Sequence, residues 1–228
     1  MMFDLHIHSN YSRDGVSSVP EIVETAMSKN LESIAITDHG PELSVGIDLS
    51  DIHALVEEVR KYQGKKSLKI ILGMEANIKD RYGNIDINEH VCKQIDFVIG
   101  SIHYVREAST TEETALAYLQ RVERAITKHR LNVLGHPFFL HRDLFPYVPR
   151  DYIEEFLELA AKRSVAMELN VKYRAPNDEF LKLCLRHNVK LSVGSDAHRA
   201  EEVGEVRWAF KKLEKLGARK EDLIINYL

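Results

Sequence analysis

The chain has 228 residues, of which 44% are hydrophobic and 29% are charged, and its formal net charge is −4 at pH 7. This balance is typical of a soluble globular protein, and it disfavours a general nucleic-acid binder, which needs a basic surface. No apolar run approaches the roughly 20 residues that cross a bilayer, and no signal peptide precedes the first strand-like run, so we expect a cytoplasmic protein without membrane contact.

Short runs rich in β-branched residues alternate with longer amphipathic runs along the whole chain. Strands are predicted at residues 2–8, 33–39, 68–78, 96–104, 131–138, 165–170 and 190–198. Helices are predicted at residues 19–31, 50–64, 111–128, 151–162, 178–187 and 200–216. Between the third and fourth strands, the sequence Tyr82-Gly83-Asn84 predicts a small hairpin or turn.

Strands that are separated by helices of this length form a parallel sheet with right-handed crossovers. The alternation continues without a linker, so residues 1–228 are predicted to form a single α/β domain. Seven β-α units favour a distorted (β/α)7 barrel, which is TIM-barrel-like but one unit short. A doubly wound open sheet is the alternative, but no GxGxxG or GxxxxGK[ST] loop supports it.

Two histidines with one residue between them, His6 and His8, end the first strand. Residues two apart in a strand project from the same face, about 7 Å apart at the backbone, which suits metal chelation better than core packing. The other strands also end in polar groups, namely Asp38, His39, Glu75, His103, His136, Glu168, Asn170, Asp196 and His198. Because the carboxyl ends of parallel barrel strands open on one face, these residues are predicted to meet in one cleft.

Imidazoles and carboxylates without a thiolate suit zinc, manganese or iron. The set exceeds what one tetrahedral ion can use, so we predict two or three divalent transition metals, with zinc first and manganese or iron as alternatives. Asp14 can join from the loop after the first strand, where Gly15 lets the chain turn back; the alternative is a simple turn residue. Asp38 is predicted to orient an imidazole rather than to bind metal.

Seven short segments carry these polar residues and span Asp4 to His198. They read DLHIHSNYSRDG, AITDHG, GMEANI, GSIHY, GHPF, MELN and VGSDAH. In combination they resemble the PHP family (polymerase and histidinol phosphatase) of metal-dependent phosphoesterases, in its small stand-alone form. The resemblance implies a (β/α)7 barrel with a trinuclear metal site.

The resemblance also implies a ligand set for each ion. One ion would be held by His6, His8, Glu75 and Asp196. Glu75 would bridge to a second ion on His103 and His136, and Asp14, His39 and His198 would hold the third. In this family a metal-bridging hydroxide attacks phosphorus; no GxSxG nucleophile elbow is present here.

Glu75, Asp196 and His198 are therefore the candidate catalytic residues, the last two as groups that manage a proton for the leaving alcohol. The expected activity is a phosphomonoesterase on a small phosphorylated metabolite, with histidinol phosphate as one candidate. A phosphodiesterase or exonuclease on nucleotides or DNA ends is the alternative, which the net charge disfavours without excluding it. A non-catalytic metal-dependent regulatory module is the third hypothesis.

Guanidinium groups in loops after the strands are candidates for binding the substrate phosphate, because their planar fork matches phosphate oxygens. Arg142 and Arg174 are the first candidates, and Arg13 and Arg199 are secondary ones. Lys172 can assist as a point charge. The sequence leaves the oligomeric state open.

Overall fold

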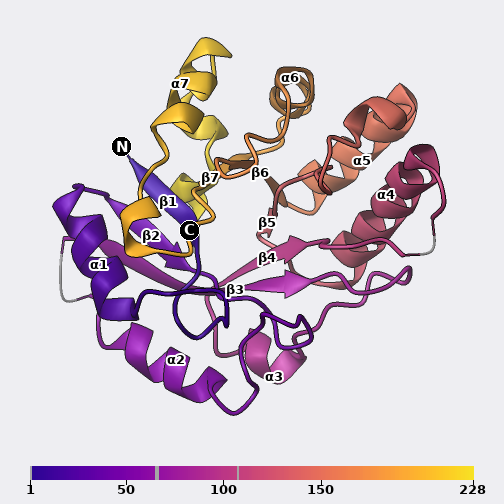
Figure 1. Cartoon of the computed structure of the whole chain (residues 1–228). Coiled ribbons are helices and arrows are strands. Elements are labelled where there is room, and N and C mark those ends of the chain that lie inside the picture. The colour runs from indigo at the N-terminus through magenta and orange to yellow at the C-terminus, as the bar shows by residue number, and fades with distance from the viewer. Residues whose placement is uncertain (1, 65–66, 107) are drawn as a thin grey trace.

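The computed structural model describes residues 2–64, 67–106 and 108–228. Within this part of the chain, seven parallel strands form one sheet in which each strand lies beside the next along the sequence (Figure 1). The strands are β1 (Phe3–Ile7), β2 (Ser33–Ile36), β3 (Lys69–Asn77), β4 (Phe97–Ser101), β5 (Val133–Leu134), β6 (Ala166–Asn170) and β7 (Leu191–Gly194). This order requires the predicted β-α crossovers and excludes the doubly wound alternative.

The sheet curls until its last strand returns to its first. Beyond β7, Ala197 forms a parallel bridge with Ile7, and the Asp196 amide donates a 2.9 Å hydrogen bond to the His6 carbonyl. The His8 amide donates to the Ala197 carbonyl at 2.8 Å. The fold is therefore the predicted, nearly closed, TIM-barrel-like barrel of seven strands, and its seam is formed at the carboxyl ends of β1 and β7.

Helices surround the strands on the outside of the barrel (Figure 1). They are α1 (Val19–Ser28), α2 (Ile52–Arg60), α3 (Glu89–Cys92), α4 (Thr111–Lys128), α5 (Arg150–Lys162), α6 (Asp178–Arg186) and α7 (Arg207–Lys215). The long helix α4 begins at a capping box, in which the Thr110 hydroxyl accepts from the Glu113 amide and the Glu113 carboxylate accepts from the Thr110 amide. Within the part of the chain that the structure describes, none of the helices is long and apolar enough to cross a membrane.

The predicted helix at residues 200–216 is wrong at its start. The structure has a short 3₁₀ turn at Ala200–Glu202, and α7 begins only at Arg207. Gly204 lies between them with φ of +77°, a conformation that favours glycine, and its amide donates a 2.8 Å hydrogen bond to the buried carboxylate of Asp4. The α-helix therefore begins only after Gly204, because the backbone first turns inward so that the Gly204 amide reaches this carboxylate.

An aromatic cluster packs between the barrel and its outer helices. Phe138 lies at its centre, 1% exposed, with ring centroids 5.2–5.7 Å from those of Tyr118, Phe156 and Phe180. The Tyr118 hydroxyl also accepts a 3.0 Å hydrogen bond from the Phe138 amide. These contacts anchor the loop after β5, which also carries the predicted metal ligand His136.

Candidate metal centre

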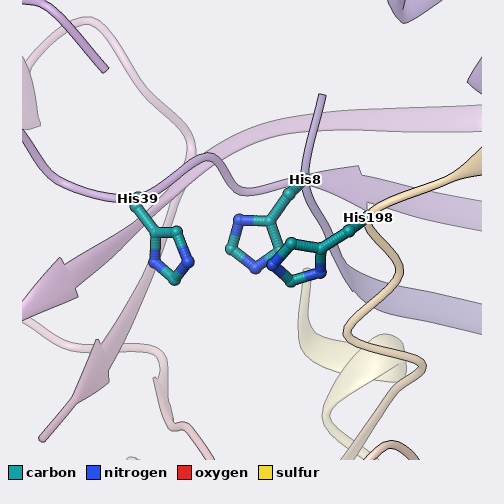
Figure 2. Close-up of side chains that lie close together, drawn as sticks. All are labelled: His8, His39 and His198. Atoms are coloured by element: carbon teal, nitrogen blue, oxygen red, sulfur yellow. The ribbon is translucent and has the colours of Figure 1, made fainter. Parts of the chain in front are cut away.

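The carboxyl ends of the strands bring six histidines into one cluster. Figure 2 shows His8, His39 and His198 side by side, and the ring centroid of His8 lies 4.2 Å from that of His39 and 4.4 Å from that of His198. His6 follows at 5.0 Å from His8. All nine predicted metal ligands lie in contact with this cluster, namely His6, His8, Asp14, His39, Glu75, His103, His136, Asp196 and His198.

Glu75 stands at the centre of the cluster and is 1% exposed. Its Oε2 atom lies 2.6 Å from His39 Nδ1, 3.5 Å from His6 Nε2 and 3.7 Å from His8 Nε2. Its Oε1 atom lies 3.2 Å from His136 Nε2 and 3.6 Å from His103 Nε2. One carboxylate thus divides its two oxygens between two groups of imidazoles, which is the geometry that a bridging ligand requires.

Potential ligand atoms gather in three groups, each within 4.8 Å. These groups are His6, His8 and Asp196; His39, Glu75 and His103; and His8, His39 and His198. The first matches three of the four residues implied for one ion. The other two mix the implied sets, because His39 lies close to Glu75 and His8 lies close to both His39 and His198.

Asp14 reaches the cluster from the loop after β1. Its Oδ2 atom lies 3.2 Å from His198 Nε2 and 3.5 Å from His39 Nε2. The loop can fold back because Gly15 has no side chain: a Cβ there would lie 1.9 Å from the Ser9 carbonyl oxygen. Asp14 therefore faces the imidazoles rather than acting only in the turn.

Opposite charges in close contact shift the pKa values of the cluster in both directions. Burial lowers the pKa of His39, but the negative charges of Glu75 and Asp14 outweigh this effect and raise it to about 10. Burial and the positive charge of His39 lower the pKa of His8 to about 3. Burial raises the pKa of Glu75, but the neighbouring imidazoles hold it well below its usual range. The cluster therefore holds ionised carboxylates beside imidazoles of mixed charge.

Several buried nitrogen and oxygen atoms of these side chains lack a hydrogen-bond partner, as expected of side chains that bind a metal cluster. Buried polar atoms normally have a hydrogen-bond partner. Among the described residues, several buried atoms here have none, namely His6 Nε2, His8 Nδ1 and Nε2, Asp14 Oδ1 and His136 Nδ1. Nitrogen and oxygen donors of this kind suit zinc, manganese or iron.

Glu168 and Asn77 hold two of the imidazoles in position, a role that was not predicted from the sequence. Glu168 Oε1 lies 2.7 Å from His6 Nδ1, so that nitrogen donates to it and Nε2 turns toward Glu75. Glu168 Oε2 accepts from the His136 amide at 2.6 Å. Asn77 Oδ1 lies 3.1 Å from His103 Nδ1. The signal for Asn77 was its spacing, two residues after Glu75 in the same strand; Glu168 was recognised only as a polar strand end.

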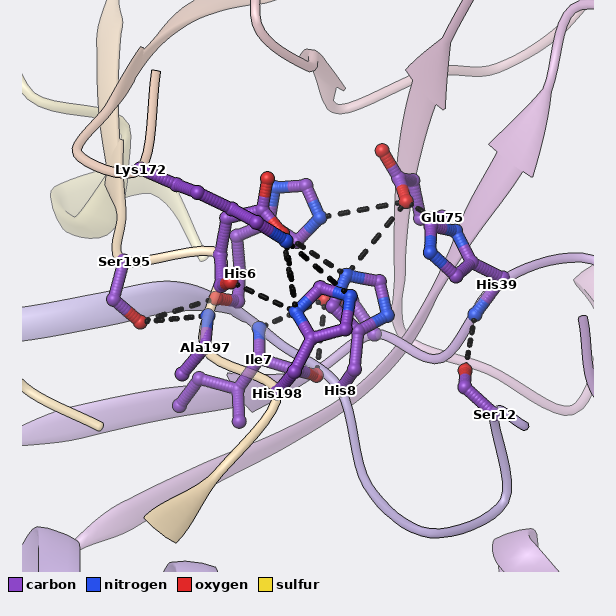
Figure 3. A network of polar contacts seen from close by, with 12 residues as sticks. His6, Ile7, His8, Ser12, His39, Glu75, Lys172, Ser195, Ala197 and His198 are labelled. Carbon is purple, nitrogen blue, oxygen red and sulfur yellow. Dashed lines mark hydrogen bonds and ion pairs between the residues drawn. The ribbon is translucent and has the colours of Figure 1, made fainter. Parts of the chain in front are cut away.

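The prediction for Asp38 is wrong. Its buried carboxylate accepts from the Ser9 amide at 2.8 Å, the Ser9 hydroxyl at 2.7 Å and the Ser12 amide at 3.1 Å, not from an imidazole. The Ser12 hydroxyl in turn accepts from the His39 amide (Figure 3). Asp38 therefore fixes the backbone of the loop that carries Asp14, because the amides of Ser9 and Ser12 in that loop donate to its carboxylate.

Among the proposed substrate-binding cations, the structure brings Lys172 to the cluster. Its Nζ lies 3.4 Å from Asp196 Oδ1 and 3.2 Å from His198 Nδ1 (Figure 3). The four arginines are exposed. Arg13 pairs with Asp48 at 2.6 Å, Arg142 donates to the Thr111 hydroxyl at 3.3 Å, Arg174 lies 5.7 Å from the centre of the Trp208 ring, and Arg199 follows His198.

Comparisons with known proteins agree with this geometry. The family model described as "PHP domain" matches residues 4–172, and a second, described as "PHP-associated", matches residues 174–226. A protein of Thermoanaerobacter sp. (strain X514) named "Probable phosphatase" is 32% identical over 99% of this chain and 90% of its own length. A "Probable phosphatase" of Caldicellulosiruptor bescii is 32% identical over 88% of this chain and 81% of its own length.

Solved structures show the same fold. The histidinol phosphate phosphatase of Lactococcus lactis, solved with zinc, L-histidinol and phosphate, matches with a TM-score of 0.72 and 21% identity over 96% of this chain and 94% of that one. A chain from Listeria monocytogenes matches with the same TM-score and 18% identity, over 91% of this chain and 99% of that one. The first family model covers most of the chain, and on that match the protein belongs to the PHP domain family.

Proposed function

We propose that this protein is a metal-dependent phosphomonoesterase that acts on a small phosphorylated metabolite. The observation that carries the proposal is the buried Glu75 carboxylate, whose two oxygens lie within 3.7 Å of five imidazoles. Support also comes from relatives named as phosphatases and from the fold of the Lactococcus lactis enzyme, which makes histidinol phosphate one candidate substrate.

The nine ligands named above would hold two or three divalent ions, with zinc as the first candidate and Glu75 as the bridging group. When bound, such ions supply an ionised water molecule and positive charge for the phosphoryl oxygens. His198 Nδ1 lies 2.9 Å from the Asp196 carbonyl and donates to it, so its Nε2 faces Asp14. Lys172 adds a positive charge beside Asp196, where it can contact a phosphoryl oxygen or the leaving oxygen.

Two chromogenic esters test the reaction class. The protein, loaded with zinc or manganese and analysed for metal, is assayed with p-nitrophenyl phosphate and bis-p-nitrophenyl phosphate. We expect a kcat/KM for the monoester at least about tenfold above that for the diester. The opposite preference would replace the proposal with a phosphodiesterase, and no turnover by the metal-loaded protein would favour a regulatory module.

Metal affinity should increase with pH. Burial lowers the pKa of His6, His39 and His136, but the charges of nearby carboxylates reverse this effect and raise all three. With its pKa raised to about 10, His39 carries a proton at neutral pH in the metal-free protein and must release it to bind metal. Each released proton makes binding about tenfold tighter per pH unit. Calorimetry in two buffers of different ionisation enthalpy counts the protons, and we expect at least one per chain; none would contradict the raised pKa values.

Removal of the Lys172 charge should weaken catalysis. We expect Lys172→Met to lower kcat/KM for a phosphomonoester by about tenfold or more, because a hydrogen bond to a charged group contributes about 1.5–3 kcal/mol. Arg142→Ala and Arg174→Ala test the two proposed arginines in the same assay. Lys211→Met, at an exposed position in α7, is the matched control. An unchanged kcat/KM in Lys172→Met at full metal content would remove Lys172 from the proposed site.

A further inference from the structure

A buried carboxylate outside the ligand set, that of Asp86, contacts the backbone of two elements that carry metal ligands. Asp86 belongs to the hairpin after β3 and is 7% exposed. Its Oδ1 atom accepts a 2.8 Å hydrogen bond from the amide of Asn77, the last residue of β3. Its Oδ2 atom accepts a 3.3 Å hydrogen bond from the amide of Glu42, in the loop after β2. Asp86 therefore joins the strand that carries Glu75 to the loop that carries His39.

The loop after β2 packs directly on this carboxylate. At Gly40 a Cβ atom would lie 2.2 Å from Asp86 Oδ1, so only glycine fits there without displacing the carboxylate. Gly40 follows His39 in the chain, and its amide donates a 2.8 Å hydrogen bond to the Glu75 carbonyl. A shift of the Asp86 carboxylate would therefore move the backbone that connects these two ligands.

A third ligand, His103, is connected to Asp86 through Asn77. The Asn77 side chain is 1% exposed, and its Oδ1 atom lies 3.1 Å from His103 Nδ1. Because the amide of the same asparagine donates to Asp86, the carboxylate and the imidazole are held by one residue. Asp86 thus contacts the supports of His39, Glu75 and His103, whose ligand atoms lie within 4.8 Å of one another.

Other contacts already close the turn of the hairpin. The Asp80 carboxylate accepts from the amides of Tyr82 and Asn84 at 2.9 and 3.1 Å. The Lys79 amide donates to the Asn84 carbonyl at 2.9 Å. These contacts are local, whereas Asp86 bonds to an amide 44 positions away in the chain. The place of Asp86 is therefore explained by what it joins rather than by the turn.

The charge of Asp86 is costly to the fold. Burial raises the pKa of its carboxyl group to about 6, and the hydrogen bonds from the two amides offset this effect only in part. A raised pKa means that folding disfavours the ionised form, although that form still predominates at neutral pH. Only the ionised form offers a free acceptor oxygen to each amide, since a protonated carboxyl group carries an O–H donor. Side chains that cost the fold stability are expected at functional sites.

We propose that Asp86 is a positioning residue of the metal centre, which fixes the spacing of His39, Glu75 and His103. This inference rests on the proposed metal-dependent function. Asp86 acts through the backbone of β3 and of the loop after β2, not by contact with an ion or with the substrate. Side chains that orient metal ligands contribute about 10–100-fold to metal affinity or activity.

Metal affinity tests this role, with a control in the same hairpin. We expect Asp86→Asn to weaken zinc binding by about 10–100-fold in competition with a chromogenic chelator. Gly40→Ala keeps the charge but displaces the carboxylate, so it should reproduce the loss, and it decides the question if Asp86→Asn does not fold. Asp80→Asn makes the same substitution at the turn and should stay within twofold of the native affinity. Native affinity in Asp86→Asn, or an equal loss in Asp80→Asn, would overturn the proposal.

Nitrogen NMR of the histidine rings in the metal-free protein gives a readout that depends on neither metal binding nor turnover. Because Asn77 Oδ1 is an acceptor, His103 should carry a proton on Nδ1 in the native protein and in Asp80→Asn. In Asp86→Asn we expect a mixture of the two His103 tautomers. If the native protein binds no zinc but this change appears, the proposed function fails while the positioning role stands. An unchanged His103 ring in Asp86→Asn would overturn the positioning role.

Discussion

Replacement of Glu75 by glutamine is expected to remove most of the bound metal and to lower kcat/KM by on the order of 10³-fold. The side chain keeps its size but loses the charge that two ions would share, and removal of an outer partner of a ligand alone costs about 10–100-fold in metal affinity or activity. In the structure the Glu75 carboxylate contacts the imidazoles of His6, His8, His39, His103 and His136. Without its charge these groups repel each other and bind metal less tightly.

Elemental analysis and steady-state kinetics on the same preparation measure the effect. Glu158→Gln, at an exposed position in α5, is the matched control and should keep full metal content and activity. Thermal unfolding of both metal-free proteins separates a damaged fold from a damaged site. Native metal content and kcat/KM in Glu75→Gln would show that the carboxylate does not bridge ions.

Glu168→Gln is expected to lower metal affinity by about 10–100-fold, although Glu168 touches no ion in the proposed site. The carboxylate accepts from His6 Nδ1, the His136 amide and Asn170 Nδ2 at 2.7, 2.6 and 3.2 Å. A glutamine offers one acceptor oxygen, so its NH₂ group must face one of these donors. The orientation of His6 or the loop that carries His136 is then disturbed.

Competition with a chromogenic chelator gives the metal affinity, and the unfolding temperature gives the stability of the metal-free protein. An orienting role predicts a larger change in metal affinity than in metal-free stability, with Glu158→Gln again as the control. A metal affinity within twofold of the native value would mean that Glu168 supports the fold rather than the ligands.

The positions of the predicted ligands could be read from sequence because two regularities act together. Side chains two apart in a strand share a face, and parallel barrel strands end on one side. His6, His8 and Glu75 therefore had to approach each other wherever the intervening helices lay. The helix at Thr111–Lys128 was predicted with its observed bounds, since an amphipathic pattern is a local signal.

The remaining features depend on contacts between residues far apart in the chain. Glu168 meets His6 across 162 positions, and Asp4 meets Gly204 across 200 positions. No local pattern specifies which partner a buried carboxylate will find, so the role of Glu168 and the break before α7 were missed. Asp38 was assigned to an imidazole for the same reason. The sequence does not show that the loop amides of Ser9 and Ser12 would donate to its carboxylate instead.

Because the seam of the barrel joins the first strand to the last, the metal site is complete only after the last strand has been synthesised. His6 and His8 lie in the first strand, while Asp196 and His198 follow the last, and the same backbone hydrogen bonds join both pairs. During synthesis the first ligands leave the ribosome long before their partners exist, so an unfinished chain cannot assemble the full cluster. Ions that bind across this seam would connect the two ends of the sheet, and by mass action they would stabilise the closed barrel.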